Sequence, residues 1–170
     1  MKRFFAVMLT VLAAAAFAAE TAVELKKNII LGWGSQTYYK SAPKVTVADG
    51  VAKVEVSETV EGAKPSRYQF GVLCKQTFKA GTAYTFTFTL KSNKAVTGGD
   101  VNFQLSGKPY TIFKRIPLKL NADEAKTFTL TYTPKEDITA PTRTPGLHFV
   151  MEAGQTVELS DVKIAEAAAE

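Results

Sequence analysis

The sequence predicts an all-β protein built as an antiparallel β-sandwich (a jelly roll) of two sheets, and three observations support that prediction. Short segments that alternate apolar with polar residues follow one another at spacings of roughly 8–15 residues, which is typical of sandwiches and barrels. Turn signals such as Asp49-Gly50 and Gly98-Gly99 separate these segments. No stretch before the C-terminal tail shows a sustained helical period of apolar residues.

The segments with this pattern predict about nine strands. They are VTVADGVAKVEV (45–56), RYQFGVLCKQTF (67–78), TAYTFTFTLK (82–91), DVNFQLSG (100–107), TIFKRIPLKL (111–120), KTFTLTYT (126–133), GLHFVMEA (146–153) and TVELSDVKI (156–164). The Asp49-Gly50 pair favours a type I′ turn, so the first segment is expected to form a hairpin. Pro117 has no backbone N–H to donate, which favours an edge position for its strand.

The segment TAYTFTFTLK shows why a second sheet is expected. Side chains alternate between the two faces of a strand, so Tyr84, Phe86 and Phe88 point one way and the threonines between them point the other way. Other segments present similar apolar faces, and one-sided strands bury such faces between two packed sheets. The threonine rows are expected to face solvent, because threonine favours strands.

Residues 1–18 have the pattern of a secretory signal peptide. Lys2 and Arg3 precede the uncharged run FFAVMLTVLAAAAFA, and Ala16 and Ala18 fit a cleavage pattern. The run is shorter than the about 20 apolar residues that span a bilayer, so a membrane anchor is the minor alternative. We therefore expect a secreted protein, periplasmic or extracellular, with no membrane span after cleavage. Residues 19–164 are expected to form one domain, and residues 165–170 an Ala/Glu tail.

Charge and cysteine content argue against several classes of function. Signal cleavage removes Lys2 and Arg3 from 21 basic residues, which lowers the formal net charge from +5 to +3. The sequence has no basic block, so a nucleic-acid partner is not expected. The single cysteine, Cys74, has no partner for an intramolecular disulfide, and its place in a strand pattern indicates a buried apolar role.

The sequence holds no recognisable catalytic motif, so we expect a protein that is not an enzyme. His148 is the only histidine, which excludes a metal site of two or three imidazoles, and it lies in a strand pattern rather than a loop. Gly98-Gly99 lacks the lysine and the following helix of a phosphate-binding loop. Counting alone leaves pairs of carboxylates open, and a small hydrolase is a remote alternative.

The order of motifs resembles that of carbohydrate-binding modules of the cellulase C type, families 4, 9, 16 and 22. The block KQTFKAGTAYTFTFTLKSNKA (75–95) is similar to their kpGktYtlsFwaKa segment, and AKTFTLTYTP is similar to a later strand of the family. The C-terminal GLHFVMEAGQTVELSDVKI is similar to the closing segment that ends on DDVsl. The resemblance covers about residues 28–164 and implies a jelly-roll fold like that of galactose-binding domains.

The resemblance also bears on cofactors. Family members often hold a structural calcium ion through a glutamate of an opening NGdFE motif and an aspartate of the closing DDV. Here the opening is NIILGWGSQTYY, which lacks that glutamate, and the closing SDV keeps only Asp161. We therefore expect no cofactor, and Asp161 is the one residue left as a candidate calcium ligand.

Family members often bind sugar in a groove on the concave outer face of one sheet, and this places the candidate site. Strands within 67–75, 100–106 and 147–152 are expected to form that sheet, and the threonine rows are expected to belong to the convex one. The expected row of hydrogen-bonding side chains is Arg67, Gln69, Asn102, Gln104, His148 and Glu152. The candidate aromatic platforms are Tyr110, in a loop beside the groove, and Trp33, for which a core position is the alternative.

These inferences lead to one expected function. The chain is expected to be a secreted, non-catalytic protein that binds a polysaccharide or oligosaccharide by aromatic stacking and amide hydrogen bonds. A separately encoded glycosidase is a candidate partner. The alternative is a protein-interaction or envelope-structural module on the same fold.

Overall fold

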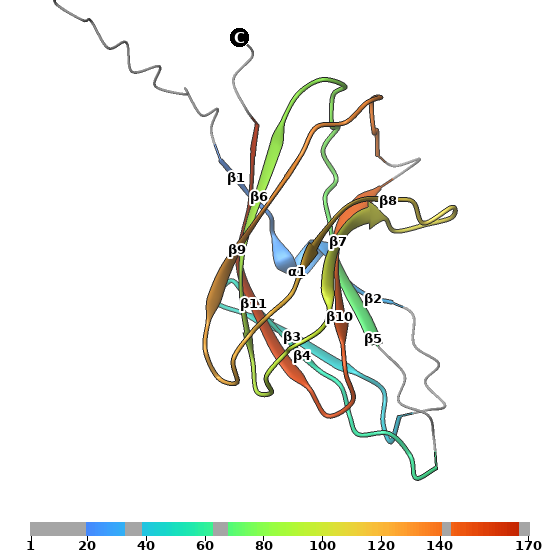
Figure 1. The fold of residues 1–170 in the computed structure, drawn as a ribbon, viewed down its shortest axis with the longest axis vertical. Helices are drawn as coiled ribbons and strands as arrows, with labels where there is room; N and C mark the ends of the chain where they lie inside the picture. The colour runs from blue at the N-terminus through green and yellow to red at the C-terminus, as the bar shows by residue number, and fades with distance from the viewer. Residues whose placement is uncertain (1–19, 33–38, 63–67, 141–143, 167–170) are drawn as a thin grey trace, which may run out of the picture.

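Two antiparallel β-sheets pack face to face in the computed structural model, which describes residues 20–32, 39–62, 68–140 and 144–166 (Figure 1). The described elements are β1 (Thr21–Ala22), α1 (Leu25–Asn28), β2 (Ile29–Gly32), β3 (Lys44–Ala48), β4 (Val51–Glu55), β5 (Tyr68–Leu73), β6 (Tyr84–Ser92), β7 (Asp100–Leu105), β8 (Ile112–Pro117), β9 (Lys126–Tyr132), β10 (Pro145–Met151) and β11 (Thr156–Glu166). The predicted all-β sandwich is therefore confirmed.

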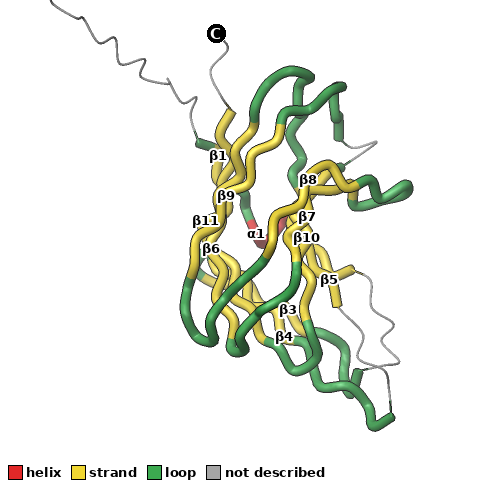
Figure 2. Tube along the Cα trace, in the orientation of Figure 1, coloured by secondary structure: helices red, strands yellow, loops and turns green. Residues whose placement is uncertain are grey.

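The two sheets have different strand orders and different outer faces. One sheet has the order β3-β4-β11-β6-β9, with β1 paired to β11, and we name it the threonine sheet. The other has the order β2-β5-β10-β7-β8, and we name it the amide sheet. Figure 2 shows the strands as two layers, with most of the loops gathered at the two ends of the sandwich.

Two local predictions about turns and edges are confirmed. Strands β3 and β4 form a hairpin in which Ala48 pairs with Val51, and Asp49 and Gly50 have the positive φ angles (50° and 75°) that a type I′ turn requires. Strand β8 lies at the edge of the amide sheet and ends at Pro117. A proline at the end of an edge strand removes no hydrogen bond between neighbouring strands of the sheet interior.

Aromatic side chains fill the space between the sheets. Phe86 comes from the threonine sheet and Phe103 from the amide sheet, and their ring centroids lie 4.6 Å apart. Phe78, which follows β5, packs against both rings at 5.7 Å and 5.3 Å. A second contact between the layers joins Phe88 of β6 to Phe149 of β10 at 5.4 Å. These fully buried rings fix which face of each strand points outward.

The predicted threonine rows lie on the outer face of the threonine sheet. Strands β6 and β9 pair so that each threonine of one stands opposite a threonine of the other. The hydroxyls of Thr85 and Thr131 are 3.3 Å apart, and those of Thr89 and Thr127 are 3.0 Å apart. These two cross-strand hydroxyl pairs satisfy part of the hydrogen-bonding capacity of the threonine rows.

Some elements differ from the sequence-based expectation. Strand β2 was not predicted, because the run Ile29–Leu31 is too short to show alternation, and it forms by pairing with β5. Strand β11 runs to Glu166, two residues into the segment 165–170 that was expected to be a tail. The expected signal peptide, residues 1–18, and residues 167–170 lie outside the described residues. Within the described ranges, no helix has the length and apolar character needed to cross a bilayer.

Replacing Phe103 with Ala should lower the free energy of unfolding by about 3–5 kcal/mol. The side chain is fully buried and contacts rings from both sheets, so its removal leaves a cavity between them. Urea denaturation measures the change. Thr129→Ala, on the outer face of β9, should shift stability by less than about 0.5 kcal/mol; equal losses in the two variants would contradict this account of the core.

Candidate functional site

The outer face of the amide sheet brings together four of the predicted site residues. The register pairs His148 of β10 with Gly71 of β5 on one side and with Asn102 of β7 on the other. Along the same strands, Val150 pairs with Gln69, and Gly146 pairs with Gln104. Because side chains alternate along a strand, Gln69, Asn102, Gln104 and His148 all lie on the face turned away from the core.

These side chains form a floor rather than an exposed row. His148 is only 1% exposed, and Asn102 and Gln104 are each 6% exposed, whereas Gln69 is half-buried. The three residues at the centre of the row are therefore covered rather than solvated. They lie outside the hydrophobic core, so neighbouring side chains and backbone on the outer face cover them and shield their polar groups from water. We call the set of Gln69, Asn102, Gln104 and His148 the floor.

Two glycines make room for the imidazole of His148. A Cβ atom added at Gly71 would lie 3.1 Å from His148 Nδ1, and one added at Gly146 would lie 3.4 Å from Nε2. The imidazole therefore lies close against the backbone of its own strand and of β5. A Cβ at Gly146 would also stand 2.6 Å from the carbonyl oxygen of Val72, a distance that real Cβ atoms do not show. Glycine is required here by close approach and not by backbone conformation.

The electrostatic state of His148 follows from this burial. Removal from water disfavours the charged imidazolium and lowers the pKa of His148 from 6.5 to about 4, so the ring is neutral at neutral pH. Its Nε2 atom is buried and has no hydrogen-bond partner among the described residues. A neutral imidazole nitrogen next to the buried amides of Asn102 and Gln104 gives the floor hydrogen-bonding capacity without net charge.

Arg115 of β8 is a site residue that the sequence reasoning missed. It pairs with Asn102 in the register, and its Nε donates to Asn102 Oδ1 at 3.0 Å. Its Nη1 lies 3.5 Å from Asp100 Oδ2, and its side chain is 54% exposed. The guanidinium is thus held by two neighbours and still offers N–H groups to a ligand at the rim of the floor. Its position depends on how β8 pairs with β7, which the sequence alone does not give. The pairing shifts between Phe103 and Gln104, and this bulge changes which side chains of β8 point outward.

Tyr110 and Glu152 lie outside the strands that carry these four residues. Tyr110 lies in the loop between β7 and β8, half-buried, with φ of 57° and its N–H donating to the Gly107 carbonyl oxygen at 2.7 Å. Glu152 is exposed and follows the end of β10, so it belongs to the next turn rather than to the row. Arg67 and Trp33 lie outside the described residues.

The candidate calcium ligand, Asp161, lies at an irregularity of β11. Its φ is 53°, and its carboxylate accepts a hydrogen bond from the Ser160 hydroxyl at 3.0 Å. Glu24 and Asp49 line the same hollow, but in the described part of the chain no three acidic, histidine or cysteine side chains are grouped as metal ligands. Asp161 as a calcium ligand therefore stays a prediction.

Cys74 is buried, as its strand pattern indicated. Burial raises the pKa of its thiol to about 12, against a smaller opposite effect from a backbone hydrogen bond with Leu147. A thiol in this state carries no thiolate at neutral pH, which makes it a structural side chain and not a nucleophile.

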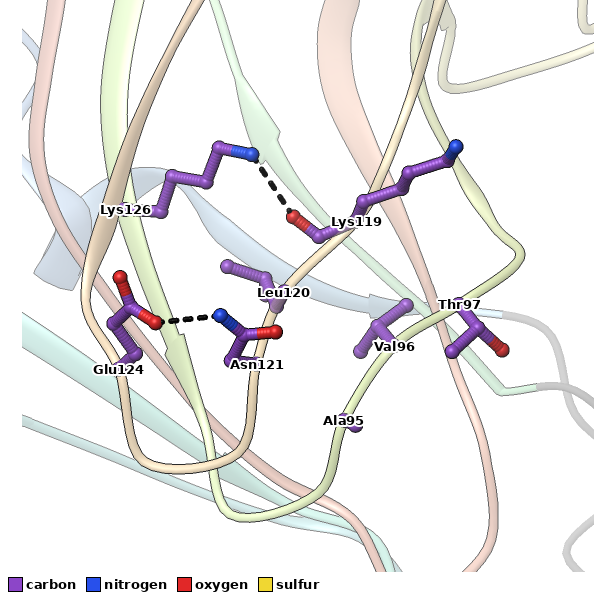
Figure 3. Close-up of a pocket in the computed structure, with 8 residues that line it drawn as sticks. All are labelled: Ala95, Val96, Thr97, Lys119, Leu120, Asn121, Glu124 and Lys126. Carbon is purple, nitrogen blue, oxygen red and sulfur yellow. Dashed lines mark hydrogen bonds between the residues drawn. The ribbon is translucent and has the colours of Figure 1, made fainter.

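A separate hollow of about 530 Å³ lies at one end of the sandwich (Figure 3). Its polar groups already bond to one another: Lys126 donates to the carbonyl oxygen of Lys119 at 3.3 Å, and the Asn121 amide donates to Glu124 at 2.7 Å. The described residues that line it include no aromatic side chain. Because these groups already bond to one another, fewer of them are available to a ligand.

Comparisons with solved structures identify the fold. A structure described as "CBM4 structure and function" matches with a TM-score of 0.61 at 17% identity, over 83% of this chain and 96% of the other. The N-terminal cellulose-binding domain of Cellulomonas fimi β-1,4-glucanase C also matches at 0.61, with 18% identity over 89% and 95%. The CBM22-1 xylan-binding domain of Paenibacillus barcinonensis Xyn10C matches at 0.54, with 8% identity over 92% and 98%.

The chain has the β-sandwich fold of these carbohydrate-binding modules. The predicted resemblance is thus confirmed for the fold. No protein-family model and no curated protein matches the sequence.

Replacing Gly146 with Ala should destabilise the protein by about 1–3 kcal/mol, because the new methyl group meets the Val72 carbonyl oxygen. Gly98→Ala is the matched control, since a Cβ at Gly98 meets nothing within 4 Å. Thermal unfolding of the two variants measures the difference. A Gly146→Ala protein as stable as Gly98→Ala would show that the strands do not approach as closely as described.

The stability of the protein should fall between pH 6.5 and about 4 because of His148. In that window the unfolded chain binds a proton that the buried imidazole does not, so stability is full above pH 6.5 and is lost as the pH falls toward 4. The loss attributable to this group is about 3 kcal/mol. Urea titrations across this window compare wild type with His148→Gln, which does not titrate; identical pH slopes would contradict the assignment.

Proposed function

We propose that this protein is a secreted, non-catalytic carbohydrate-binding protein. Its ligand is a polysaccharide or oligosaccharide, held on the outer face of the amide sheet. The observation that carries the proposal is a set of hydrogen-bonding side chains on one face: the buried and half-buried amides, the neutral imidazole of His148 and the guanidinium of Arg115, which Asn102 holds. Solved structures with the same sandwich fold include cellulose-binding and xylan-binding domains.

The chemistry of this face suits neutral sugars. Amides both donate and accept hydrogen bonds, and a guanidinium donates to two acceptors at once, which matches adjacent hydroxyls. Gln69 and Gln104 make no side-chain hydrogen bond among the described residues, so their amides are available to a ligand. Arg115 is pre-positioned by Asn102 and Asp100, which reduces the entropy lost when it binds.

The opposite outer face supports the same assignment by contrast. On that face the hydroxyls of Thr85 and Thr131 pair with each other across β6 and β9, and so do those of Thr89 and Thr127. A ligand bound on the threonine rows would have to compete with these pairs. The amide sheet is therefore the better binding face of the two.

The proposed cellular role is to hold a polysaccharide outside the cytoplasm or to serve a glycosidase encoded elsewhere. Residues 1–18 support export, because their charge, apolar run and small residues fit a signal peptide. The His148 imidazole is neutral and buried, and the Cys74 thiol is protonated, so neither supports a catalytic role.

Affinity gel electrophoresis of residues 19–170 against soluble β-glucans, xylans, mannans and pectins tests the proposal. One polymer should retard the protein, and Arg115→Ala should weaken that retardation by about tenfold in dissociation constant, because a charged hydrogen-bond donor is lost. Lys114→Ala is the matched control, since Lys114 pairs with core-facing Phe103 rather than with Asn102. Tyr110→Ala tests the loop aromatic in the same gels.

The outcomes separate the two functions that the sequence left open. Retardation that depends on Arg115 but not on Lys114 supports the sugar-binding site. A folded protein that no polymer retards would overturn the proposal, and the protein-interaction or envelope-structural module would then be the better account.

A further inference from the structure

A further hollow lies beside β8, at the edge of the amide sheet. It has a volume of about 560 Å³, within the range of small-molecule sites. The residues that line it are Ile112, Phe113, Tyr132, Thr133, Lys135, Glu136 and Ile138. They come from β8, from β9 and from the segment that follows β9, so the hollow lies where the edge strands of the two sheets face each other.

Two half-buried aromatic rings form its wall. The rings of Phe113 and Tyr132 have centroids 5.6 Å apart and planes inclined at 35°, and both pack against the buried ring of Phe103 at 5.5 Å and 5.4 Å. They are thus the outer members of the aromatic cluster that fills the core. Contact with Phe103 holds each ring rigidly, while the open side of the sandwich leaves part of each ring accessible.

Hydrogen-bonding groups surround these rings. Thr133, Lys135 and Glu136 are exposed and line the same hollow. Partial burial, and then the negative charge of Glu136, raise the pKa of the Tyr132 phenol, which places the carboxylate near the phenol and keeps the phenol protonated as a donor. An aromatic wall with a carboxylate, a hydroxyl and an ammonium group at its rim is the combination that pyranose rings require.

Among the described residues, the floor offers no aromatic platform for stacking against a sugar ring. In the described part of the amide sheet, the outer face of β5, β10 and β7 carries amides, glycines, aliphatic side chains, Asp100 and His148, but no phenylalanine, tyrosine or tryptophan. Phe113 and Tyr132 are a described aromatic pair that lies beside this face and is open to a ligand.

Ile112 connects the two surfaces. It pairs with Gln104 on the groove side and also lines the hollow, and it is 43% exposed, one of three large apolar side chains that are exposed in the described ranges. An exposed isoleucine at this ridge offers an apolar surface over which a sugar chain can pass from the floor to the aromatic wall.

We propose that the hollow between β8 and β9 is a second saccharide subsite, which binds the continuation of the same sugar chain that occupies the groove. This inference rests on the proposed carbohydrate-binding function. The chain crosses β8 at Ile112, and a further sugar ring packs on Phe113 and Tyr132 with its hydroxyls on Glu136 and Thr133. Only an oligosaccharide long enough to reach both surfaces gains affinity from the second subsite.

Isothermal titration calorimetry with trisaccharides and hexasaccharides of the cello, xylo, manno and laminari series tests this proposal. For the series that binds, the wild-type protein should bind the hexasaccharide more tightly than the trisaccharide. Tyr132→Ala should weaken hexasaccharide binding by about tenfold and leave trisaccharide binding unchanged. Glu136→Gln, an exposed position that does not endanger folding, should weaken hexasaccharide binding in the same selective way.

Matched controls are Thr129→Ala on the far face of β9 and Glu61→Gln in an exposed turn, and both should bind like wild type. If the hexasaccharide binds and Arg115→Ala weakens it, but Tyr132→Ala and Glu136→Gln bind both lengths like wild type, the second subsite is overturned and the groove stands. If no series binds the wild-type protein, the proposed function and the subsite fall together.

Discussion

Contact between Phe86 and Phe103 across the two sheets is the interaction on which the rest of the structure depends. Each ring belongs to a strand whose side chains alternate, so burying the rings between the layers decides the outward face of β6 and of β7 at once. Neighbouring strands then follow through the register. A shift of one residue would exchange the faces and place Asn102 and Gln104 in the core, where their amides would lack partners.

The floor of the amide sheet depends on a second constraint, which is close approach of backbones. Gly71 and Gly146 remove the two Cβ atoms that would otherwise collide with the imidazole or with a neighbouring carbonyl. With that space available, His148 packs close to the backbone, loses contact with water and stays neutral. Asn102 is buried beside it in the register, and its side-chain oxygen accepts the hydrogen bond that holds Arg115. The glycines Gly71 and Gly146 at the centre of the sheet thus contribute to the position of Arg115 at its edge.

The fold and the outward-facing side of each strand were predictable from the sequence. The burial of His148 and the position of Arg115 on the edge strand β8 were not. Alternation in segments such as residues 82–91 fixes which side chains share a face, and this depends only on local geometry. The burial of His148 requires glycines on two different strands, which are brought together only by pairing of distant segments. Arg115 was missed because the bulge opposite Phe103 and Gln104 shifts the alternation of β8, and a bulge has no reliable signature in a single sequence.

The aromatic core between the two sheets ends at the edge where β8 faces β9. Two sheets that are not closed into a barrel leave a gap at the side of the sandwich, and the aromatic core must end there. Phe113 and Tyr132 end it with rings that are rigid on their inner side, through Phe103, and accessible on their outer side. A rigid, partly exposed aromatic surface loses little entropy when it binds a ligand, which is the condition that favours affinity. The aromatic core is incompletely buried at this edge, and the described floor carries no aromatic ring. Both observations support an arrangement in which hydrogen bonding and stacking occur on adjacent surfaces of β8.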